Sequence, residues 1–272
     1  MEELPLAEYL GIKVIQLDNA VVMVKLDRGP NNFFDLTLVS SIASAYEHAA
    51  ANPECRAIVL AAEGKNFCAG ANFSPAPADV KAAPASVTRQ APSSENTLYA
   101  EAVRLVQAPL PVVAAVQGAA VGGGLGLACS ADFRVGSPET RLTANFSQLG
   151  FHHGFGLSVT LPRIVGSQRA NELLLTGKRI GGEEGYRVGL LDRLVRSEEL
   201  EAAAIALARE IASSAPLSIR SIRATMREGL VEEFRAATDR EAVEQSKLRG
   251  THDFREGVGA AVERRTPVFT GR

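Results

Sequence analysis

Cysteine, histidine and net charge are all scarce in this sequence, and each scarcity argues against a class of protein. The three cysteines, Cys55, Cys68 and Cys129, cannot all pair and form no C-x-x-C motif, so we expect reduced thiols and a cytoplasmic protein. Four histidines without an H-E-x-x-H or similar spacing predict no metal site. A formal net charge of −2, from 29 basic and 31 acidic residues, gives no general electrostatic reason to bind nucleic acid.

One long stretch of the chain lacks charge altogether. Residues 105–131 contain no Asp, Glu, Lys or Arg, and this length would be sufficient to cross a bilayer. However, Pro109, Pro111 and the glycines at 122–124 and 126 divide the stretch into strand, turn and helix. The first residues are acidic and lack the basic and apolar segments of a signal peptide. We therefore expect no membrane span and no signal peptide.

The order of the predicted elements indicates an α/β fold with a helical C-terminal part. With 272 residues and 46% hydrophobic composition, the chain is long and apolar enough to bury its own core. Thr37 is the predicted N-cap of the first helix. The sequence predicts strands at 12–17, 21–26, 56–61, 111–116 and 133–135, and helices at 37–51, 97–107 and 123–130. From residue 158 the pattern is almost entirely helical, and 191–195 is the one clear exception. We therefore divide the chain into a core at 1–195 and a helical region at 196–272.

Residues 74–96 show no periodic apolar pattern. They are rich in Pro, Ala and Ser and directly follow a glycine-containing loop. This composition predicts a mobile insertion, which is either a lid over a substrate or a plain surface loop.

Two segments share one design, in which a buried strand runs into a turn of small residues. The strand at 56–61 leads into GKNFCAGA at 64–71, and the strand at 111–116 leads into QGAAVGGG at 117–124. A helix that begins in the second turn directs free N–H groups and the positive end of its dipole at that turn. Two such N–H groups that converge form an oxyanion hole, which stabilises an enolate or a tetrahedral thioester adduct. The alternative is that the small residues only permit close strand–helix packing.

The same two turns resemble the signature motifs of the crotonase (enoyl-CoA hydratase/isomerase) superfamily. NFCAGAN at 66–72 is similar to the first motif, and PVVAAVQGAAVGGG at 111–124 is similar to the second. Segments 173–180, 189–195 and 256–269 resemble later parts of the family in the same order. The resemblance implies a crotonase-like β-spiral core with surrounding helices and a C-terminal helical trimerisation region. It also implies a homotrimer or a dimer of trimers.

As substrate, the resemblance implies an acyl-CoA thioester, with coenzyme A as part of it and no tightly bound cofactor. The amides of Ala71 and Gly123 would be the two oxyanion donors. Arg264 and Arg265 fall where the last helix can meet the CoA adenine or phosphates, although a solvated helix end explains them as well. The implied substrate-binding positions are Asn32, Phe33, Ala69, Asn72, Phe73, Ala120, Gly122, Asn145, Phe146 and Leu149.

Two positions depart from the family pattern. Hydratases of the family use two glutamates to activate water and to protonate the α-carbon, and here these positions hold Gly126 and Phe146. We therefore expect neither a two-glutamate hydratase nor a glutamate-dependent isomerase. The pocket should be more apolar and roomier on one side. His152 and His153, in the loop that borders the acyl group, are the candidate proton-transfer groups, and a hydrogen bond to the backbone is the alternative for each.

These observations favour an acyl-CoA-processing enzyme with a divergent reaction of the hydrolase, decarboxylase or isomerase type. The alternative is a non-catalytic acyl-CoA-binding or scaffold homologue. A third interpretation is RNA binding through Arg220, Arg223 and Arg227. Because these arginines recur at helical spacing near glutamates, we favour a solvated helix face for them.

Overall fold

The computed structural model describes residues 9–18, 20–72 and 97–272. The described strands are β1 (Ile12–Asp18), β2 (Val21–Leu26), β3 (Ala57–Ala62), β4 (Val112–Val116), β5 (Ala119–Val121), β6 (Phe133–Gly136), β7 (Arg141–Thr143), β8 (Arg179–Gly181) and β9 (Arg193–Leu194). They form a six-stranded sheet in the order β1-β2-β3-β4-β6-β9 and a three-stranded sheet in the order β5-β7-β8. In the larger sheet, β1 and β2 are antiparallel and the other neighbours are parallel.

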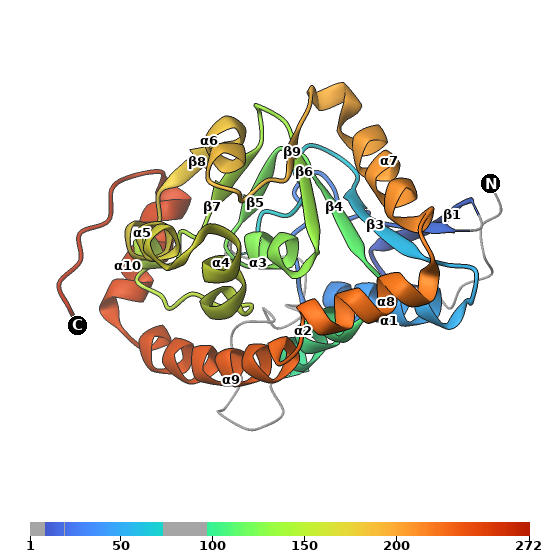
Figure 1. Ribbon diagram of the computed structural model, residues 1–272. Coiled ribbons are helices and arrows are strands. Elements are labelled where there is room, and N and C mark those ends of the chain that lie inside the picture. Colours follow the sequence, from blue (N-terminus) through green and yellow to red (C-terminus); the bar gives the residue numbers. More distant parts are fainter. Residues whose placement is uncertain (1–8, 19, 73–96) are drawn as a thin grey trace.

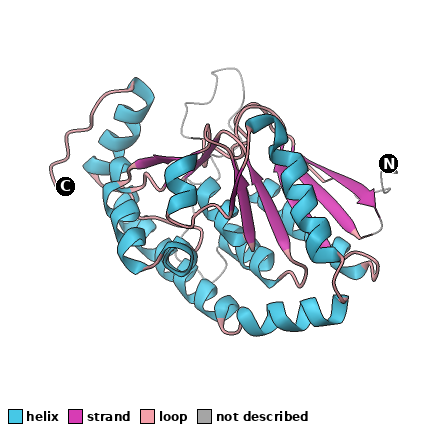
Figure 2. Ribbon diagram, turned by 45° about the horizontal axis from the view of Figure 1, so that its top comes forward, coloured by secondary structure: helices cyan, strands magenta, loops and turns pink. Residues whose placement is uncertain are grey.

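Helices surround both sheets (Figures 1 and 2). The α-helices are α1 (Leu36–Ala51), α2 (Thr97–Gln107), α3 (Gly123–Ser130), α4 (Leu157–Val165), α5 (Ser167–Thr176), α6 (Gly182–Arg187), α7 (Leu200–Ala212), α8 (Pro216–Met226), α9 (Leu230–Arg249) and α10 (His252–Glu263). Short 3₁₀ helices lie at Ser147–Leu149 and Ser197–Glu199. This mixed architecture agrees with the α/β crotonase-like fold implied by the resemblance.

Alternate residues of β3 face two different hydrophobic layers. Every residue of this strand is buried. Ile58 and Leu60 belong to the larger layer, which includes residues of α1, α2 and α3. Val59 and Ala61 belong to a smaller layer that α7 covers. Because both faces of the sheet are covered, the ends of the parallel strands are where turns can present groups to a ligand.

Most predicted elements occur within one or two residues of their expected positions, and two details differ. The predicted N-cap Thr37 is wrong: Asp35 caps α1, because its carboxylate accepts a hydrogen bond from Leu38 N at 2.9 Å. The short strands β5, β7 and β8 are absent from the sequence prediction. Each has three residues, which is too few to establish an alternating pattern. The expectation for 74–96 falls outside the described residues.

Among the described residues, no single helix is long and apolar enough to cross a bilayer. Ser197–Ala212 and Pro216–Met226 together reach the length and apolar composition of a membrane span, but they are bent by 105° relative to each other. The uncharged stretch 105–131 forms the end of α2, then β4, β5 and α3. Its lack of charge therefore reflects burial in the protein core.

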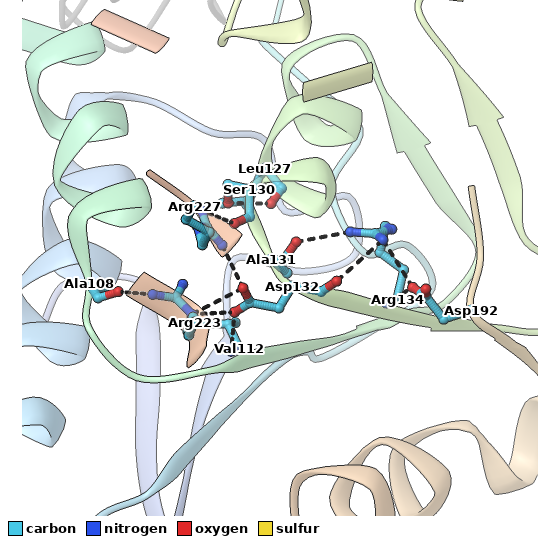
Figure 3. Close-up of polar contacts among 10 residues, drawn as sticks. All are labelled: Ala108, Val112, Leu127, Ser130, Ala131, Asp132, Arg134, Asp192, Arg223 and Arg227. Atoms are coloured by element: carbon cyan, nitrogen blue, oxygen red, sulfur yellow. Dashed lines mark hydrogen bonds and ion pairs between the residues drawn. The ribbon is translucent and has the colours of Figure 1, made fainter. Parts of the chain in front are cut away.

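A cluster of charges at the C-terminal end of α3 attaches α8 to the core (Figure 3). Asp132 accepts hydrogen bonds from Arg223 Nε at 3.0 Å and from Arg227 Nη1 at 2.7 Å. Val112 N also donates to Asp132, at 2.8 Å. The arginine side chains are only 11% and 15% exposed. The solvated-face interpretation is therefore wrong for these two arginines, and their guanidinium groups are committed within the chain rather than open to nucleic acid.

A third arginine fixes the same end of α3 from another side (Figure 3). Arg134, in β6, donates to Ala131 O at 2.9 Å and forms an ion pair with Asp192 at 3.0 Å. Cations near a helix C-terminus interact favourably with the helix dipole. Since all eight residues of α3 are buried, this helix is held firmly at the end opposite Gly123.

All three cysteines are buried and unpaired, so the expectation of free thiols is confirmed. Cys68 is fully buried in the strand-like segment before the first glycine turn. Burial raises the pKa of the Cys68 thiol to about 12. The thiol is therefore protonated at neutral pH.

Candidate active site

Backbone pairing between two distant segments brings the two glycine turns together. Cys68 N donates to Ala119 O, and Val121 N donates to Cys68 O, each at 3.0 Å. Cys68 and Ala120 thereby form a parallel bridge beside the smaller sheet. A Cβ atom at Gly124 would clash with Cys68 O, so only glycine allows this close approach.

The amides of Ala71 and Gly123, the predicted oxyanion donors, meet at this junction. A Cβ atom built on Gly70 would lie 3.9 Å from Gly123 N, so the two turns are in van der Waals contact. Gly122, with φ 55°, caps α3 and places the Gly123 N–H in the free first turn of the helix. Neither amide donates a hydrogen bond to a described residue. Two free N–H groups beside a helix N-terminus can stabilise an anion.

Ala71 and Gly123 both line a cavity of about 160 Å³. Its polar side chains are Tyr99, Asn145 and Gln245, and no charged side chain is present among the described residues that line it. The lining residues are Phe34, Ala69, Gly70, Ala71, Leu98, Tyr99, Val121, Gly122, Gly123, Asn145, Phe146, Leu149, Phe151, Gly154, Phe155, Gln245 and Ala261. The cavity is therefore a mostly apolar space whose lining includes both of the predicted oxyanion donors, Ala71 and Gly123.

A larger cleft of about 610 Å³ lies beyond the carboxyl ends of β2 and β3. Lys25 within it pairs with Glu201 at 2.8 Å and with Glu63 at 3.3 Å. None of the predicted site residues lines this cleft. We therefore assign the candidate active site to the smaller cavity.

Seven of the predicted site residues line the smaller cavity: Ala69, Ala71, Gly122, Gly123, Asn145, Phe146 and Leu149. Eight others do not line it: Asn32, Phe33, Asn72, Ala120, His152, His153, Arg264 and Arg265. Phe73 lies outside the described residues. The structure thus brings together the two glycine turns and the 145–149 loop.

Asn32 joins two loops instead of facing the cavity. Its fully buried side chain accepts a hydrogen bond from Arg28 N and donates to Glu63 O and Asn66 O, each at 2.8 Å. All of these partners belong to the chain itself. The nearby aromatic side chain that does line the cavity is Phe34.

Phe155 covers Gly126, which the sequence resemblance aligns with the first hydratase glutamate. A Cβ atom at Gly126 would lie 2.6 Å from Phe155 Cβ. The Phe155 ring meets the Phe34 ring edge-on, with 5.6 Å between centroids. The expectation of a roomier pocket at Gly126 is therefore wrong, because Phe155 fills that space. Phe146, which the resemblance aligns with the second hydratase glutamate, lines the cavity.

His152 and His153 do not line the cavity. Their rings are stacked with centroids 4.2 Å apart. His152 Nδ1 lies 2.8 Å from His153 O, and His153 Nε2 lies 2.8 Å from Ser158 Oγ. Catalysis by either histidine stays a prediction, and the structure gives His152 a partner in the loop and His153 a partner in α4.

Glu241 is a buried carboxylate that the sequence analysis did not single out. It lies on α9 and accepts hydrogen bonds from Gly156 N at 2.8 Å and from Ser158 N at 3.1 Å. Ser158 Oγ also donates to it, at 2.6 Å. Burial raises the pKa of Glu241, although these three hydrogen bonds oppose the rise. Since both amides lie at the start of α4, the carboxylate caps that helix and fixes the loop before it.

Acidification is expected to destabilise the protein through His153. Burial, with a smaller contribution from His152, lowers the pKa of His153 to about 4, whereas an exposed histidine titrates near 6.5. Between these values the native state binds fewer protons than the unfolded state. The free energy of unfolding therefore falls by up to about 3 kcal/mol as the pH drops across this window. Urea denaturation of wild type and His153→Gln at about pH 7 and about pH 5 measures this effect; equal losses in both proteins would contradict it.

Tyr99 and Gln245 form a polar wall of the cavity that the sequence analysis missed. Tyr99 Oη donates to Gln245 Oε1 at 2.9 Å, and Gln245 Nε2 donates to His152 O at 3.1 Å. Burial raises the pKa of Tyr99, so its phenol is protonated at neutral pH. These residues are 146 positions apart in the sequence, and no motif links them.

The two arginines predicted to contact CoA lie at the exposed end of α10. Arg265 forms ion pairs with Glu263 at 2.6 Å and with Glu256. Arg264 is the left-handed C-cap of the helix, with φ 57°. Neither lines the cavity. Their contact with CoA stays a prediction, in which Arg265 would exchange a carboxylate partner for a phosphate.

Comparison with known proteins identifies the family. The Enoyl-CoA hydratase/isomerase family model matches residues 16–272. A protein of Rhodobacter capsulatus that bears the name "Probable enoyl-CoA hydratase" is 33% identical over 266 residues, which cover 96% of this chain and 95% of that protein.

Solved structures agree with this assignment. The enoyl-CoA hydratase/isomerase of Pseudoalteromonas atlantica T6c has a TM-score of 0.83 and 27% identity, with coverage of 96% of this chain and 100% of that one. An enoyl-CoA hydratase of Mycobacterium avium subsp. paratuberculosis K-10 has a TM-score of 0.80 and 27% identity, with coverage of 96% and 98%. The protein is therefore an acyl-CoA enzyme of crotonase fold that belongs to the enoyl-CoA hydratase/isomerase family.

Proposed function

We propose that the protein decarboxylates an acyl-CoA thioester that carries a carboxylate on its α-carbon. The thioester oxygen accepts hydrogen bonds from the amides of Ala71 and Gly123. The observation that carries this proposal is the combination of two unpaired amides with a cavity that has no charged side chain among its described lining residues. Coenzyme A enters as part of the substrate, and the reaction requires no separate cofactor.

The proposed step needs no side-chain base. The bond between the α-carbon and the carboxylate breaks, and carbon dioxide leaves. The electron pair of that bond forms the enolate double bond, and the thioester oxygen becomes negative between the two amides. Water then donates a proton to the α-carbon. An uncharged, mostly apolar cavity favours this step because it stabilises the localised charge of the substrate carboxylate poorly, whereas the two amides stabilise the same charge on the enolate oxygen.

Hydration of an enoyl-CoA fits these residues poorly. Adding water requires one group that takes a proton and one that gives a proton. Gly126 and Phe146 stand at the two glutamate positions. The polar side chains of the cavity, Tyr99, Asn145 and Gln245, can orient a ligand, but none accepts a proton readily at neutral pH. The names of the relatives therefore do not decide the reaction of this chain.

A panel of acyl-CoA substrates tests the proposal. Purified protein is incubated with malonyl-CoA, methylmalonyl-CoA and crotonyl-CoA, and the products are separated by liquid chromatography and identified by mass. We expect acetyl-CoA from the first, propionyl-CoA from the second and no hydrated product from the third. Each reaction is compared with a sample that lacks protein.

Other outcomes identify the competing functions. Release of free coenzyme A would contradict decarboxylation and support hydrolysis assisted by a histidine. Hydration of crotonyl-CoA would support a hydratase that uses groups outside the described lining. Calorimetric binding of every thioester without turnover would support a non-catalytic acyl-CoA-binding homologue.

A further inference from the structure

Phe155 has a backbone conformation that is rare for a bulky residue. Its φ is 61°, and it is one of three non-glycine residues with positive φ among the described residues. It lies between Gly154 and Gly156 in the loop before α4. Such conformations persist only where the surroundings impose them, and they occur preferentially at functional sites.

Contacts on both sides hold this loop in place. The buried carboxylate of Glu241 accepts the hydrogen bond from Gly156 N at 2.8 Å. A Cβ atom at Gly156 would clash with the Phe234 ring, and one at Gly154 would clash with Tyr99 Oη. The loop therefore has no room to shift, and the direction of the Phe155 side chain is fixed.

The Phe155 ring closes the cavity beside the anion-stabilising amides. It is 1% exposed, lines the cavity and packs on Gly126. Gly126 follows Gly123 by three residues, so the ring stands roughly 4.5 Å along α3 from the Gly123 amide. Phe34 contacts the same ring edge-on. An acyl chain that starts at the amides therefore meets this aromatic wall after only a few carbon atoms.

We infer that Phe155 sets the length of the acyl group and restricts the enzyme to short-chain acyl-CoA thioesters. The cavity of about 160 Å³ is similar in size to an apolar cavity of roughly 150 Å³ that holds one benzene molecule, which suits up to about six carbon atoms. This inference rests on the proposed binding of the acyl group in the cavity. It does not depend on decarboxylation.

Calorimetric binding of a series of straight-chain thioesters tests the inference without requiring turnover. The series runs from acetyl-CoA to decanoyl-CoA. For the wild type, we expect affinity to be greatest at or below hexanoyl-CoA and to fall for longer chains. Phe155→Ala opens the wall, and each additional buried methylene then adds about fourfold in affinity. The ratio of octanoyl-CoA affinity to butyryl-CoA affinity should therefore rise at least tenfold.

Two further variants keep the test decisive. Phe155→Leu retains an apolar side chain in case the alanine variant does not fold, and it should shift the ratio in the same direction by a smaller factor. Phe146→Ala removes another ring from the lining, beside Gly122, and should weaken binding of every chain length by a similar factor. An unchanged chain-length profile in folded Phe155 variants would overturn this inference and would leave the proposed function unaffected. Failure of the wild type to bind any thioester would overturn the proposed function as well.

Discussion

Replacing Ala71 by proline is expected to lower kcat by about 10²–10³-fold on the acyl-CoA that the enzyme turns over. Proline has no N–H group, so the oxygen of the enolate loses one of its two donors. The remaining donor, the Gly123 amide, stays in place because α3 is held at its other end by Arg134 and Arg227. Steady-state kinetics of the purified variant measures this loss.

Ala71→Ser is the matched control for this experiment. It changes the side chain at the same position and keeps the amide, so its kcat should stay within a few-fold of the wild type. Calorimetric binding of a non-reactive acyl-CoA should change much less than kcat in the proline variant, because the amide interacts most strongly with the charged intermediate. Equal activities of the two variants would show that the Ala71 amide does not act on the reacting oxygen.

Replacing Asp132 by alanine is expected to reduce the free energy of unfolding by about 3–5 kcal/mol. The change leaves the guanidinium groups of Arg223 and Arg227 without their carboxylate partner, at only 11% and 15% exposure. It also removes the acceptor of Val112 N. Urea denaturation followed by circular dichroism measures the loss.

Glu210→Ala is the matched control, because it breaks an ion pair at the surface. Glu210 is 67% exposed and pairs with Arg193 at 2.7 Å, so its loss should cost no more than about 1 kcal/mol. A triple replacement of Asp132, Arg223 and Arg227 by methionine should recover part of the stability lost in Asp132→Ala, since no unpaired charge is left buried. A loss for Asp132→Ala as small as that for Glu210→Ala would contradict the prediction.

Local patterns in the sequence predicted most of the fold. The hairpin of β1 and β2 follows from two apolar runs around Asp18, and its carboxylate accepts hydrogen bonds from Ala20 N and Val21 N in the turn. The start of α1 was harder to place, because Asp35 and Thr37 are both capping residues and only the backbone decides between them. Strand β5 was missed because its three residues, Ala119–Val121, directly precede three glycines and resemble part of a turn.

The positions of Ala71 and Gly123 at the cavity were predictable, because they depend on backbone turns and on glycines that a motif records. The rest of the cavity depends on packing between distant segments. Tyr99 and Gln245 meet across two helices, and nothing in either local sequence predicts the contact. The interpretation of Arg223 failed for the same reason, because its partner Asp132 lies 91 residues away. Phe155 was missed because its position depends on a left-handed backbone conformation, which is uncommon for phenylalanine.

The burial of Cys68 has a chemical consequence for an enzyme that binds thioesters. A thioester transfers its acyl group to thiolates, and Cys68 lies three residues before Ala71, whose amide is the proposed oxygen donor. Burial raises the pKa of the Cys68 thiol, so it is protonated at neutral pH and a poor nucleophile. If the thioester binds as proposed, its activated acyl group would therefore lie near a cysteine that does not take it up.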